Sequence, residues 1–557
     1  MYRALHAQAL NKKKGETTAL LLDGYVDEPA SLGVPPYVSP QARYAYGALR
    51  AAGAEARYIT IDQLRSGTAI PEADLLVALM GAVVPGKYLR GMPASARELC
   101  EIARIRRWVT VIGGAGVKFG QSDEIQSHFQ HIARSDLDAY IFDFMKNGEA
   151  RNRARTPEEW RDWSVSGAEA VRHHPDFPEP LIAELDTSRG CVRYFAGGCG
   201  FCIEPSHGKP YFRPPEEVAG EVKALHAQGV VNFRLGGQAC IYSYMAGGVG
   251  KTETPRPNVK ALKALLAGVR RAAPNLKVLH LDNANPAVIA EHPEEAAEAT
   301  RIMVGHCTSG NVVAFGMESA DPAVIVANNL NATPEQVLAA VRIVNEAGTE
   351  RGENGLPKLL PGINILAGLD GETARTFDLN YRFLKGVLDE GLLLRRINVR
   401  QVAPTVREFA TGDRNYGAFR RFKERVRTEI DAPMLARVAP SGGVLRDVYM
   451  EVQIGGCAYG RQIGSYPILV SFPYRAGLNR FSDALVVGHG PRSVTAVETP
   501  LDVNHAPMGA LEALPGIGRK RAVRLARRRP FKDIDEMKAA LDDPSIVQSL
   551  MKHLRFQ

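Results

Sequence analysis

Three of the chain's seven cysteines fall in one short stretch, "RGCVRYFAGGCGFCIEP" at residues 189–205. Cys191, Cys199 and Cys202 have the spacing C-x7-C-x2-C, and the glycines between them let the backbone turn sharply around a bound group. Thiolates are soft ligands, and three of them on one loop indicate a metal site. We therefore expect the chemistry of this chain to centre on this loop.

Two kinds of metal group fit such a loop. A structural zinc ion normally takes four ligands, and His207, five residues after Cys202, is the candidate for the fourth. Three cysteines without a fourth ligand instead suit a four-iron cluster with one iron left open, which departs from the usual ligation by four cysteines. An open iron can bind a further molecule and is therefore reactive.

Composition limits the classes of protein to consider. The 557 residues are 45% hydrophobic and 23% charged, which is typical of a globular chain with several domains. The apolar runs are far shorter than the roughly 20 residues that cross a bilayer, and no secretory signal stands at the start. We therefore expect a cytoplasmic protein with no membrane partner. The net charge of +8 permits a polyanionic partner without requiring one.

Residues 17–150 alternate strand-like and helical patterns. "TALLLDG", "ADLLVALM" and "WVTVIGGAG" are apolar runs of strand length, and helical segments separate them. This alternation predicts an α/β domain with a doubly wound parallel sheet. The glycines of "VIGGAG" at 111–116 follow a strand, where such sheets bind ligands, but a tight turn accounts for them equally well. Residues 151–183 lose the alternation and are expected to be a linker.

Residues 184–405 resume the alternation with six strand-like runs. With right-handed crossovers these would form a partial (β/α)6 barrel, whose chemistry is expected at the carboxyl ends of the strands. The runs are "LIAELDTSRG", "GVVNFRLGGQ", "NLKVLHLDN", "NVVAFGMES", "LLPGINILAGLDGE" and "LLLRRINV". The cysteine loop follows the first of them.

Over roughly 184–405 the chain resembles the radical S-adenosylmethionine (radical SAM) superfamily. The commonest spacing in that superfamily is C-x3-C-x2-C, so the longer first gap here is a departure that blurs the subfamily. Phe201, directly before the last cysteine, fits the pattern of the superfamily. The resemblance implies a 4Fe-4S cluster held by Cys191, Cys199 and Cys202.

Three further motifs carry the resemblance, each at the end of an expected strand. "LGGQ", with Gly236, Gly237 and Gln238, resembles the Gly-Gly-Glu element that receives the amino group of SAM. Gln in place of Glu removes a charge but keeps a carbonyl acceptor. The remaining residues that the resemblance assigns to cofactor binding are Glu318 and Ser319 of "GMES", and Gly368 of "GLDGET".

The resemblance also implies a reaction. One electron passed through the cluster would cleave SAM to methionine and a 5′-deoxyadenosyl radical, which abstracts hydrogen from the substrate. An electron donor such as a ferredoxin or flavodoxin would be a partner. The motifs assign no catalytic residue to the substrate itself, and they leave open whether SAM is also a methyl donor.

The N-terminal domain, 17–150, resembles the cobalamin-binding domain that precedes the barrel in many radical SAM enzymes. The Asp-x-His-x-x-Gly loop of one class of those domains is absent. Either cobalamin binds here without a histidine ligand or the domain is a relic. It also resembles the tRNA methylthiotransferases, but those need three further cysteines in this domain, and only Cys100 is present.

The C-terminal part is expected to hold three more segments. Residues 406–446 predict a helical connector, and 447–503 alternate apolar and polar residues around glycine-rich turns. That alternation predicts a small antiparallel β module resembling TRAM or OB-like domains. Residues 508–557 resemble a helix-hairpin-helix motif of the archaeal radical SAM type, with "LPGIG" as the hairpin.

Such a hairpin binds nucleic-acid backbone through N–H groups at the start of a helix. Gly516, Gly518, Lys520 and Arg521 are the residues expected to contact it. Three hypotheses follow. The chain is a radical SAM enzyme that modifies a nucleic acid, with tRNA as the first choice, or one that acts on a small molecule or protein and uses the hairpin for docking. The third is a non-catalytic iron-sulfur protein that binds nucleic acid.

Overall fold

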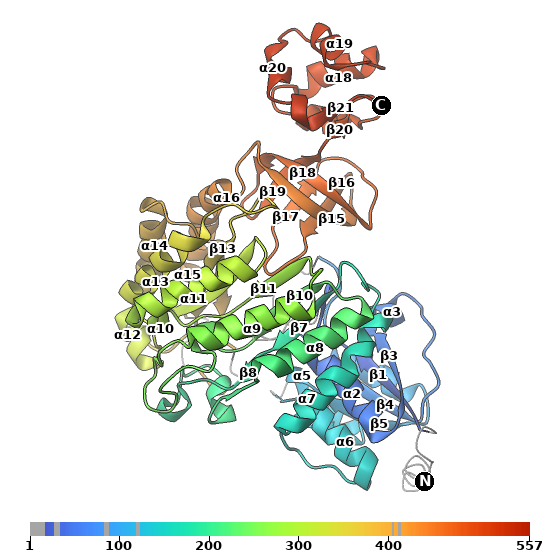
Figure 1. Cartoon of the computed structure of the whole chain (residues 1–557), viewed down its shortest axis with the longest axis vertical. Coiled ribbons are helices and arrows are strands. Elements are labelled where there is room, and N and C mark those ends of the chain that lie inside the picture. Colours follow the sequence, from blue (N-terminus) through green and yellow to red (C-terminus); the bar gives the residue numbers. More distant parts are fainter. Residues whose placement is uncertain (1–16, 27–33, 83–88, 119–122, 404–405, 410–413) are drawn as a thin grey trace. The chain divides into compact units, whose positions relative to one another are not determined.

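The computed structural model describes residues 17–26, 34–82, 89–118, 123–403, 406–409 and 414–557. Two compact units divide the chain. The first is Met1–Phe195 with Ile203–Asn283, and the second is Ala196–Cys202 with Ala284–Gln557. Both contain parallel sheets with helices, which confirms the predicted mixed α/β class (Figure 1). Among the described residues, none of the helices is long and apolar enough to cross a membrane.

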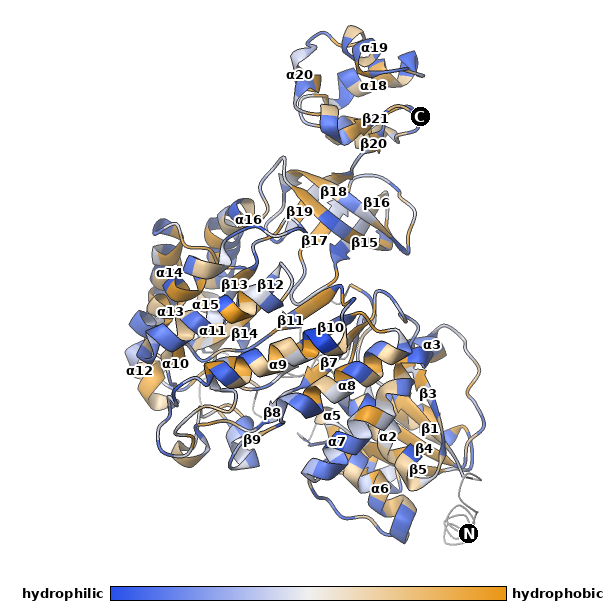
Figure 2. Cartoon of the chain, viewed as in Figure 1, coloured by the Kyte–Doolittle hydropathy of each residue, from blue (hydrophilic) through white to orange (hydrophobic). Residues whose placement is uncertain are grey.

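The first unit opens with a five-stranded parallel sheet in the order β3-β1-β4-β5-β6. Alternate residues of β1 pack on opposite faces: Leu21 lies in a cluster with helices α2 and α6, and Leu22 in one with α3 and α4. The apolar strands therefore have helices on both sides (Figure 2). The strands are β1 (Thr18–Asp23), β3 (Glu55–Thr60), β4 (Leu75–Leu79), β5 (Val109–Gly113) and β6 (His131–Ala133), and the helices are α2 (Pro40–Ala52), α3 (Ile61–Arg65), α4 (Ala96–Arg104), α5 (Ala115–Lys118) and α6 (Leu137–Asn147).

The expected linker, 151–183, is largely helical. It contains α7 (Pro157–Ser166) and the 3-10 helix η2 (Gly167–His173), both packed on α2. Trp160 is buried, and its ring meets that of Tyr44 edge to face at 6.3 Å. Trp160 and Trp163 bury a large apolar area in this otherwise polar segment. The linker prediction was wrong because the alternation of strand-like and helical patterns carries no information about this packing.

The second sheet of the first unit has the order β11-β10-β7-β2 and is parallel throughout. Phe233 and Leu235 of β10 alternate with the buried Arg234, so one face of the sheet is apolar and the other carries charge. Its strands are β2 (Tyr37–Val38), β7 (Ile182–Asp186), β10 (Asn232–Gly237) and β11 (Val278–Leu281). β8 (Ser188–Arg189) and β9 (Tyr211–Phe212) form a separate antiparallel pair. The same unit contains the helices α8 (Pro215–Gln228) and α9 (Val259–Ala272).

The second unit holds the other three strands predicted for the barrel, as a parallel sheet β12-β13-β14. The six predicted strands thus form two sheets of three, with β2 added to the first. An isolated parallel bridge pairs Ala284, just after β11, with Phe315 of β12. The elements are β12 (Asn311–Glu318), β13 (Leu359–Ala367), β14 (Arg396–Gln401), α10 (Pro286–Glu291), α11 (Pro293–His306), α12 (Pro322–Ala327), α13 (Pro334–Gly348) and α14 (Ala374–Asp389). The connector contributes α15 (Tyr416–Arg425), the π-helix η6 (Val426–Asp431) and α16 (Ala432–Val438).

A closed five-stranded barrel follows, in the order β15-β16-β17-β19-β18. Its neighbours are antiparallel except for the parallel pair β17 and β19. β15 pairs with both β16 and β18, which closes the barrel. The strands are β15 (Val444–Ile454), β16 (Cys457–Gln462), β17 (Leu469–Phe472), β18 (Arg480–His489) and β19 (Ser493–Glu498).

The last segment is a group of short helices closed by a strand pair. β20 (Leu501–Asp502) pairs in parallel with β21 (Leu554–Arg555), so the end of the chain returns to the start of the segment. Between them lie α17 (Met508–Ala513), α18 (Gly518–Arg528), α19 (Ile534–Ala539) and α20 (Ser545–Gln548).

Candidate cofactor site

Cys191 belongs to the first unit, in the loop that follows β7. The backbone N–H of Arg193 donates a hydrogen bond to Cys191 Sγ at 3.5 Å, and the Arg193 side chain pairs with Glu253 at 2.6 Å. Burial raises the pKa of the Cys191 thiol. A thiol held in this way needs a bound metal, or a nearby cation, to become a thiolate near neutral pH.

Gly236 and Gly237 end β10, and neither position has room for a side chain. A Cβ on Gly236 would lie 2.1 Å from Glu184 Oε1, and one on Gly237 would lie 1.8 Å from Asp186 Oδ1. Glycine is therefore required at both positions by close packing between β7 and β10.

Gln238 is 3% exposed, and its amide binds three protein groups. Oε1 accepts a hydrogen bond from Thr187 Oγ1 at 3.0 Å, and Nε2 donates to the carbonyl oxygens of Leu235 and Asp282. The amide therefore links the ends of β7, β10 and β11. A carbonyl oxygen has two lone pairs, so Oε1 keeps one for a further donor.

Asn283, which the motifs did not assign to the site, positions the same turn. It follows β11 with a left-handed φ of 57°, and its side-chain amide donates to the carbonyl oxygen of Gln238 at 2.9 Å and of Gly236 at 3.4 Å. Asn tolerates this backbone region better than most residues. The signal in the sequence was an Asn directly after a strand, in "LDNAN".

A layer of buried charge lies on the polar face of β7, β10 and β11. The guanidinium of Arg234 bridges the carboxyl groups of Glu184 and Asp282, and all three residues are at most 1% exposed. Burial raises the pKa of Glu184 to about 8, against the opposing effect of Arg234. This layer ties together the three strands whose ends carry Gly236 to Gln238 and Asn283.

Cys199 and Cys202 belong to the second unit, on the segment Ala196–Cys202. The N–H of Cys202 donates to the carbonyl oxygen of Cys199 at 2.9 Å, which closes a turn, and Gly200 N–H donates to Asn328 O at 2.9 Å. Asn329 Nδ2 donates to Gly198 O at 2.7 Å. The two cysteines are therefore fastened to the end of α12.

Asn328 is a second residue that the motifs missed. Its Nδ2 donates to Asp370 O at 2.8 Å, and its Oδ1 accepts from Asp370 N–H at 3.2 Å and from Arg407 Nη2 at 3.2 Å. Through these contacts it joins the cysteine turn to the "GLDGET" turn. Phe201 packs beside Cys199 on a small apolar cluster that includes Leu369.

The other residues expected at the cofactor lie at the ends of β12 and β13. Glu318 has a left-handed φ of 59°, and a Cβ on Gly316 would lie 3.1 Å from its Oε1. Ser319 is fully buried, and its Oγ accepts from Asp321 N–H at 3.1 Å. Gly368, with φ of 90°, donates its N–H to Glu372 Oε2 at 2.8 Å. A non-glycine residue held in this backbone region, as Glu318 is, marks a site under strain.

The three cysteines supply a soft donor set that suits iron-sulfur chemistry. In the part of the chain that the structure describes, no three His, Cys, Asp or Glu side chains are grouped to hold a metal ion, and Cys191 lies in a different unit from Cys199 and Cys202. The chemistry of the three donors fits an iron-sulfur cluster. His207 lies in the first unit, where its Nδ1 accepts from Arg189 Nε at 3.3 Å.

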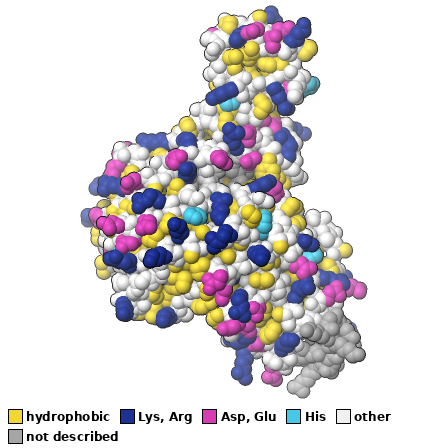
Figure 3. Space-filling model, viewed as in Figure 1, with side chains coloured by type: hydrophobic (Ala, Val, Ile, Leu, Met, Phe, Trp, Pro, Cys, Tyr) yellow, Lys and Arg dark blue, Asp and Glu magenta, His cyan; other side chains and the backbone are white. Residues whose placement is uncertain are grey.

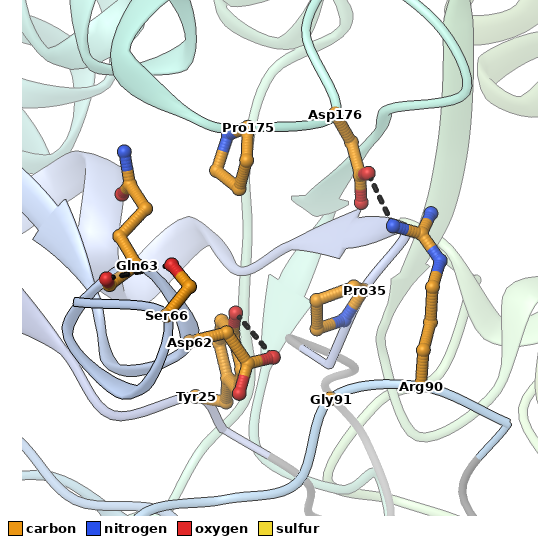
Figure 4. A pocket seen from close by; sticks show the side chains of 9 residues that line it. All are labelled: Tyr25, Pro35, Asp62, Gln63, Ser66, Arg90, Gly91, Pro175 and Asp176. Atoms are coloured by element: carbon orange, nitrogen blue, oxygen red, sulfur yellow. Dashed lines mark hydrogen bonds and ion pairs between the residues drawn. The ribbon is translucent and has the colours of Figure 1, made fainter. Parts of the chain in front are cut away.

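A pocket of about 190 Å³ lies in the first unit, where Pro175 and Asp176 of the segment 151–183 meet the N-terminal domain (Figure 4). The Tyr25 hydroxyl donates to Asp62 Oδ2 at 3.0 Å on one side, and Arg90 pairs with Asp176 at 2.5 Å on the other. The glycines of "VIGGAG" do not line it. A Cβ on Gly114 would lie 2.5 Å from Met80 O, so the close approach of protein backbone accounts for that glycine.

The hairpin of the C-terminal segment has both glycines in the left-handed region, with φ of 78° at Gly516 and 57° at Gly518. Lys520 is exposed at the start of α18. Arg521 instead pairs with Asp542 at 2.7 Å and donates to the carbonyl oxygen of Gly516 at 2.7 Å. Of these two cations, Lys520 is the one available to a partner, whereas Arg521 holds the hairpin.

Comparison with known proteins adds relatives along most of the chain. Residues 185–384 match the radical SAM superfamily. An uncharacterised protein of Methanocaldococcus jannaschii is 45% identical over 503 residues, covering 86% of this chain and 92% of that protein. An uncharacterised protein of Archaeoglobus fulgidus is 43% identical over 538 residues, covering 94% and 97% respectively.

Among solved structures, the chain is similar to the radical SAM enzyme coproporphyrinogen III oxidase from Escherichia coli. The sequence identity is 14%, the match covers 54% of this chain and 70% of that one, and the TM-score of 0.31 is too low to establish a shared fold. The match of residues 185–384, together with the cysteine loop inside it, identifies the chain as a radical SAM enzyme that belongs to the radical SAM superfamily.

Proposed function

We propose that this enzyme binds a 4Fe-4S cluster through Cys191, Cys199 and Cys202 and cleaves SAM reductively in order to modify a nucleic acid, with tRNA as the first choice. The observation that carries the proposal is the set of three thiols between β7 and α8, inside the segment that matches the superfamily. When bound, the cluster would supply the electron that releases the 5′-deoxyadenosyl radical from SAM.

The roles of the chain's own residues follow from their contacts. Gly236 and Gly237 keep the end of β10 free of side chains, and the remaining lone pair of Gln238 Oε1 is the acceptor for the amino group of SAM. Glu318 and Ser319 at β12, Gly368 at β13 and Phe201 in the cysteine turn are the other proposed cofactor contacts. Their work is to bind and orient SAM.

The nucleic-acid substrate is supported by the two C-terminal modules. The barrel has five strands, as OB-folds that bind oligonucleotides do, and the hairpin presents Gly518 with open space beside its Cα and the exposed Lys520. Figure 3 shows Lys and Arg side chains interspersed with Asp and Glu on the C-terminal helices. Contacts of this kind grip phosphates without reading the base sequence.

Two partners complete the proposal. A ferredoxin or flavodoxin would reduce the cluster. Cobalamin in the N-terminal domain is a secondary candidate, favoured by the flavodoxin-like strand order of that sheet. Incubation with hydroxocobalamin tests it, because a protein that retains no cobalamin absorption after gel filtration does not bind the cofactor.

Anaerobic reconstitution with iron and sulfide, followed by reduction with dithionite and chromatography for 5′-deoxyadenosine, tests the SAM chemistry. The wild type should form 5′-deoxyadenosine, and the Cys199→Ala and Cys202→Ala variants should not. Cys457→Ala is the matched control, because Cys457 begins β16 in the barrel and lies outside the loop. Equal product from all four proteins would contradict the assignment of the ligands.

Binding to tRNA across a salt series tests the substrate class. Phosphate contacts release counterions, so the logarithm of the affinity should fall steeply with the logarithm of the salt concentration. Absence of salt-dependent binding in the full chain would remove nucleic acid from the proposal and leave a small molecule or protein as the substrate.

A further inference from the structure

One loop at the candidate site is assigned neither to the cluster nor to SAM. Residues 245–253, "MAGGVGKTE", which we call the glycine loop, follow the end of β10 and the short helix η5 (Ile241–Ser243). The run "GGVGKT" approaches the phosphate-loop pattern G-x-x-x-x-G-K-[ST], with Met245 in place of the first glycine. The chain does not enter a helix at Thr252, since α9 begins only at Val259. Any anion site here must therefore be made by the loop itself.

The backbone of the glycine loop leaves consecutive donors unused. Gly248 and Gly250 have left-handed φ values of 93° and 83°, while Val249 between them does not. The N–H groups of Lys251 and Thr252 donate to Gly248 O at 3.0 and 3.3 Å. Those of Gly248 and Val249 make no hydrogen bond within the described part of the chain. Successive N–H groups with alternating backbone handedness form a concavity that binds anions.

Charge at the glycine loop is positive. Lys251 is exposed and forms no ion pair with any described residue. The one acidic residue of the loop, Glu253, has its carboxylate paired with Arg193 at 2.6 Å. The free amides are thus accompanied by an ammonium group and not by a competing carboxylate. Amides and a lysine in the same short loop are the donors that hold phosphate in proteins.

The glycine loop is also attached to the cysteine loop within the first unit. Arg193, the partner of Glu253, lies two residues after Cys191. The Tyr194 hydroxyl lies 3.0 Å from the position that a Cβ on Gly250 would take, so these two loops touch there. A group bound to the glycine loop would therefore lie beside the loop that carries Cys191.

We propose that the glycine loop binds a phosphate group of the substrate and so positions the substrate beside the candidate cluster. This inference rests on the proposed function, because it assigns the substrate a phosphate. The ligand is a phosphate monoester of a nucleotide or a phosphodiester of a nucleic acid. Binding is made by the N–H groups of Gly248 and Val249 with the ammonium group of Lys251.

Sub-second hydrogen–deuterium exchange of the full chain tests the inference at the level of the peptide. Unbonded exposed amides exchange rapidly, and a phosphate bound to them should slow the exchange of peptides that cover 245–253. The probes are AMP, inorganic pyrophosphate and a single-stranded RNA octamer. Protection by AMP indicates a nucleotide monoester, protection by RNA alone indicates a phosphodiester, and either supports the proposal.

Lys251→Glu should lower the affinity of the probe that protects residues 245–253 by at least about tenfold, which is the loss expected for a charge-assisted hydrogen bond. Lys260→Glu is the matched control, because Lys260 is exposed on α9 outside the loop and should leave protection unchanged. No protection of 245–253 by any probe, or equal protection in Lys251→Glu, would overturn the inference.

The same experiment separates this inference from the proposed function. SAM cleavage without substrate should be equal in the wild type and the control variant Lys260→Glu, because Lys260 lies on α9 and is assigned neither to the glycine loop nor to SAM. RNA that protects the hairpin peptides around 514–520 but not 245–253 would retain the nucleic-acid substrate and overturn only the role of this loop. Protection of 245–253 by AMP without any RNA binding would retain the loop and remove nucleic acid from the proposed function.

Discussion

The side-chain amide of Asn283 donates a hydrogen bond to the carbonyl oxygen of Gln238 at 2.9 Å, so the residue after β11 holds the turn after β10. Both residues lie in the first unit, on a sheet that is parallel throughout. The carboxyl ends of neighbouring parallel strands meet at one edge, and this bond fixes two of them relative to each other.

Asn283→Asp should weaken SAM binding about fivefold or more, because it removes the amide that donates to Gln238 O at 2.9 Å and to Gly236 O at 3.4 Å while the left-handed backbone remains accessible. The shorter bond alone contributes about 1 kcal/mol. Equilibrium dialysis of SAM measures the effect, and iron content should not change. Asn283→Gly, which keeps the backbone conformation but also lacks the donor, should match Asn283→Asp. Unchanged SAM affinity in both variants would show that the turn holds without this bond.

Asn328→Ala should lower the iron content after reconstitution. The substitution removes the amide that joins the "GLDGET" turn to the end of α12, to which the Cys199 turn is fastened. The two hydrogen bonds between Asn328 and Asp370 are lost, and each contributes about 0.5–1.5 kcal/mol. Asn331→Ala, three residues further, is the control and should bind iron as the wild type does. Iron and sulfide assays provide the readout.

Gly237→Ala should destabilise the first unit by about 1–3 kcal/mol, the usual cost of overpacking, because its Cβ would meet Asp186 Oδ1. Gly220→Ala is a matched control in α8, where a Cβ meets nothing within 4 Å. This variant should raise the free energy of unfolding by about 0.5–1 kcal/mol. Urea unfolding of both variants measures the difference. A neutral Gly237→Ala would show that β7 and β10 can separate at this point.

Stability should fall as the pH rises from about 5 to 8, in part because of Glu184. Its pKa is raised by burial from 4.5 to about 8, so in this range the folded state keeps a proton that the unfolded state has released. Glu184→Gln removes this titration and should flatten the dependence of the melting temperature on pH between 5 and 8. An equally steep dependence in the variant would assign the proton to another group, such as Asp186, whose pKa burial raises to about 7.

Lys520→Ala and Arg521→Ala should have different effects. Lys520→Ala should weaken RNA binding and lower the slope of log affinity against log salt by about one, as expected for a lost phosphate contact. Arg521→Ala should chiefly lower the melting temperature of the C-terminal segment, because Arg521 holds Gly516 O and Asp542. Fluorescence anisotropy and thermal melts distinguish them. An equal loss of RNA affinity in both variants would show that Arg521 also contacts phosphate.

The sequence predicts local features of the fold better than features that depend on contacts between distant segments. The period of two in β15 to β19 and the strand-helix alternation before it are local signals, and they predicted the α/β class. The helix at Pro157–Ser166 was missed because its stabilisation comes from burying Trp160 against Tyr44, a contact between distant segments.

The residue types and spacing of Cys191, Cys199 and Cys202 by themselves indicated a metal site, because soft donors so close in sequence need no fold to be recognised. The motifs at three further strand ends were needed for the resemblance to the radical SAM superfamily. Only the tertiary structure decided what Asn283, Asn328 and Arg521 do. Each acts on a segment elsewhere in the chain, and a hydrogen bond between segments depends on distances that the linear order of residues does not contain.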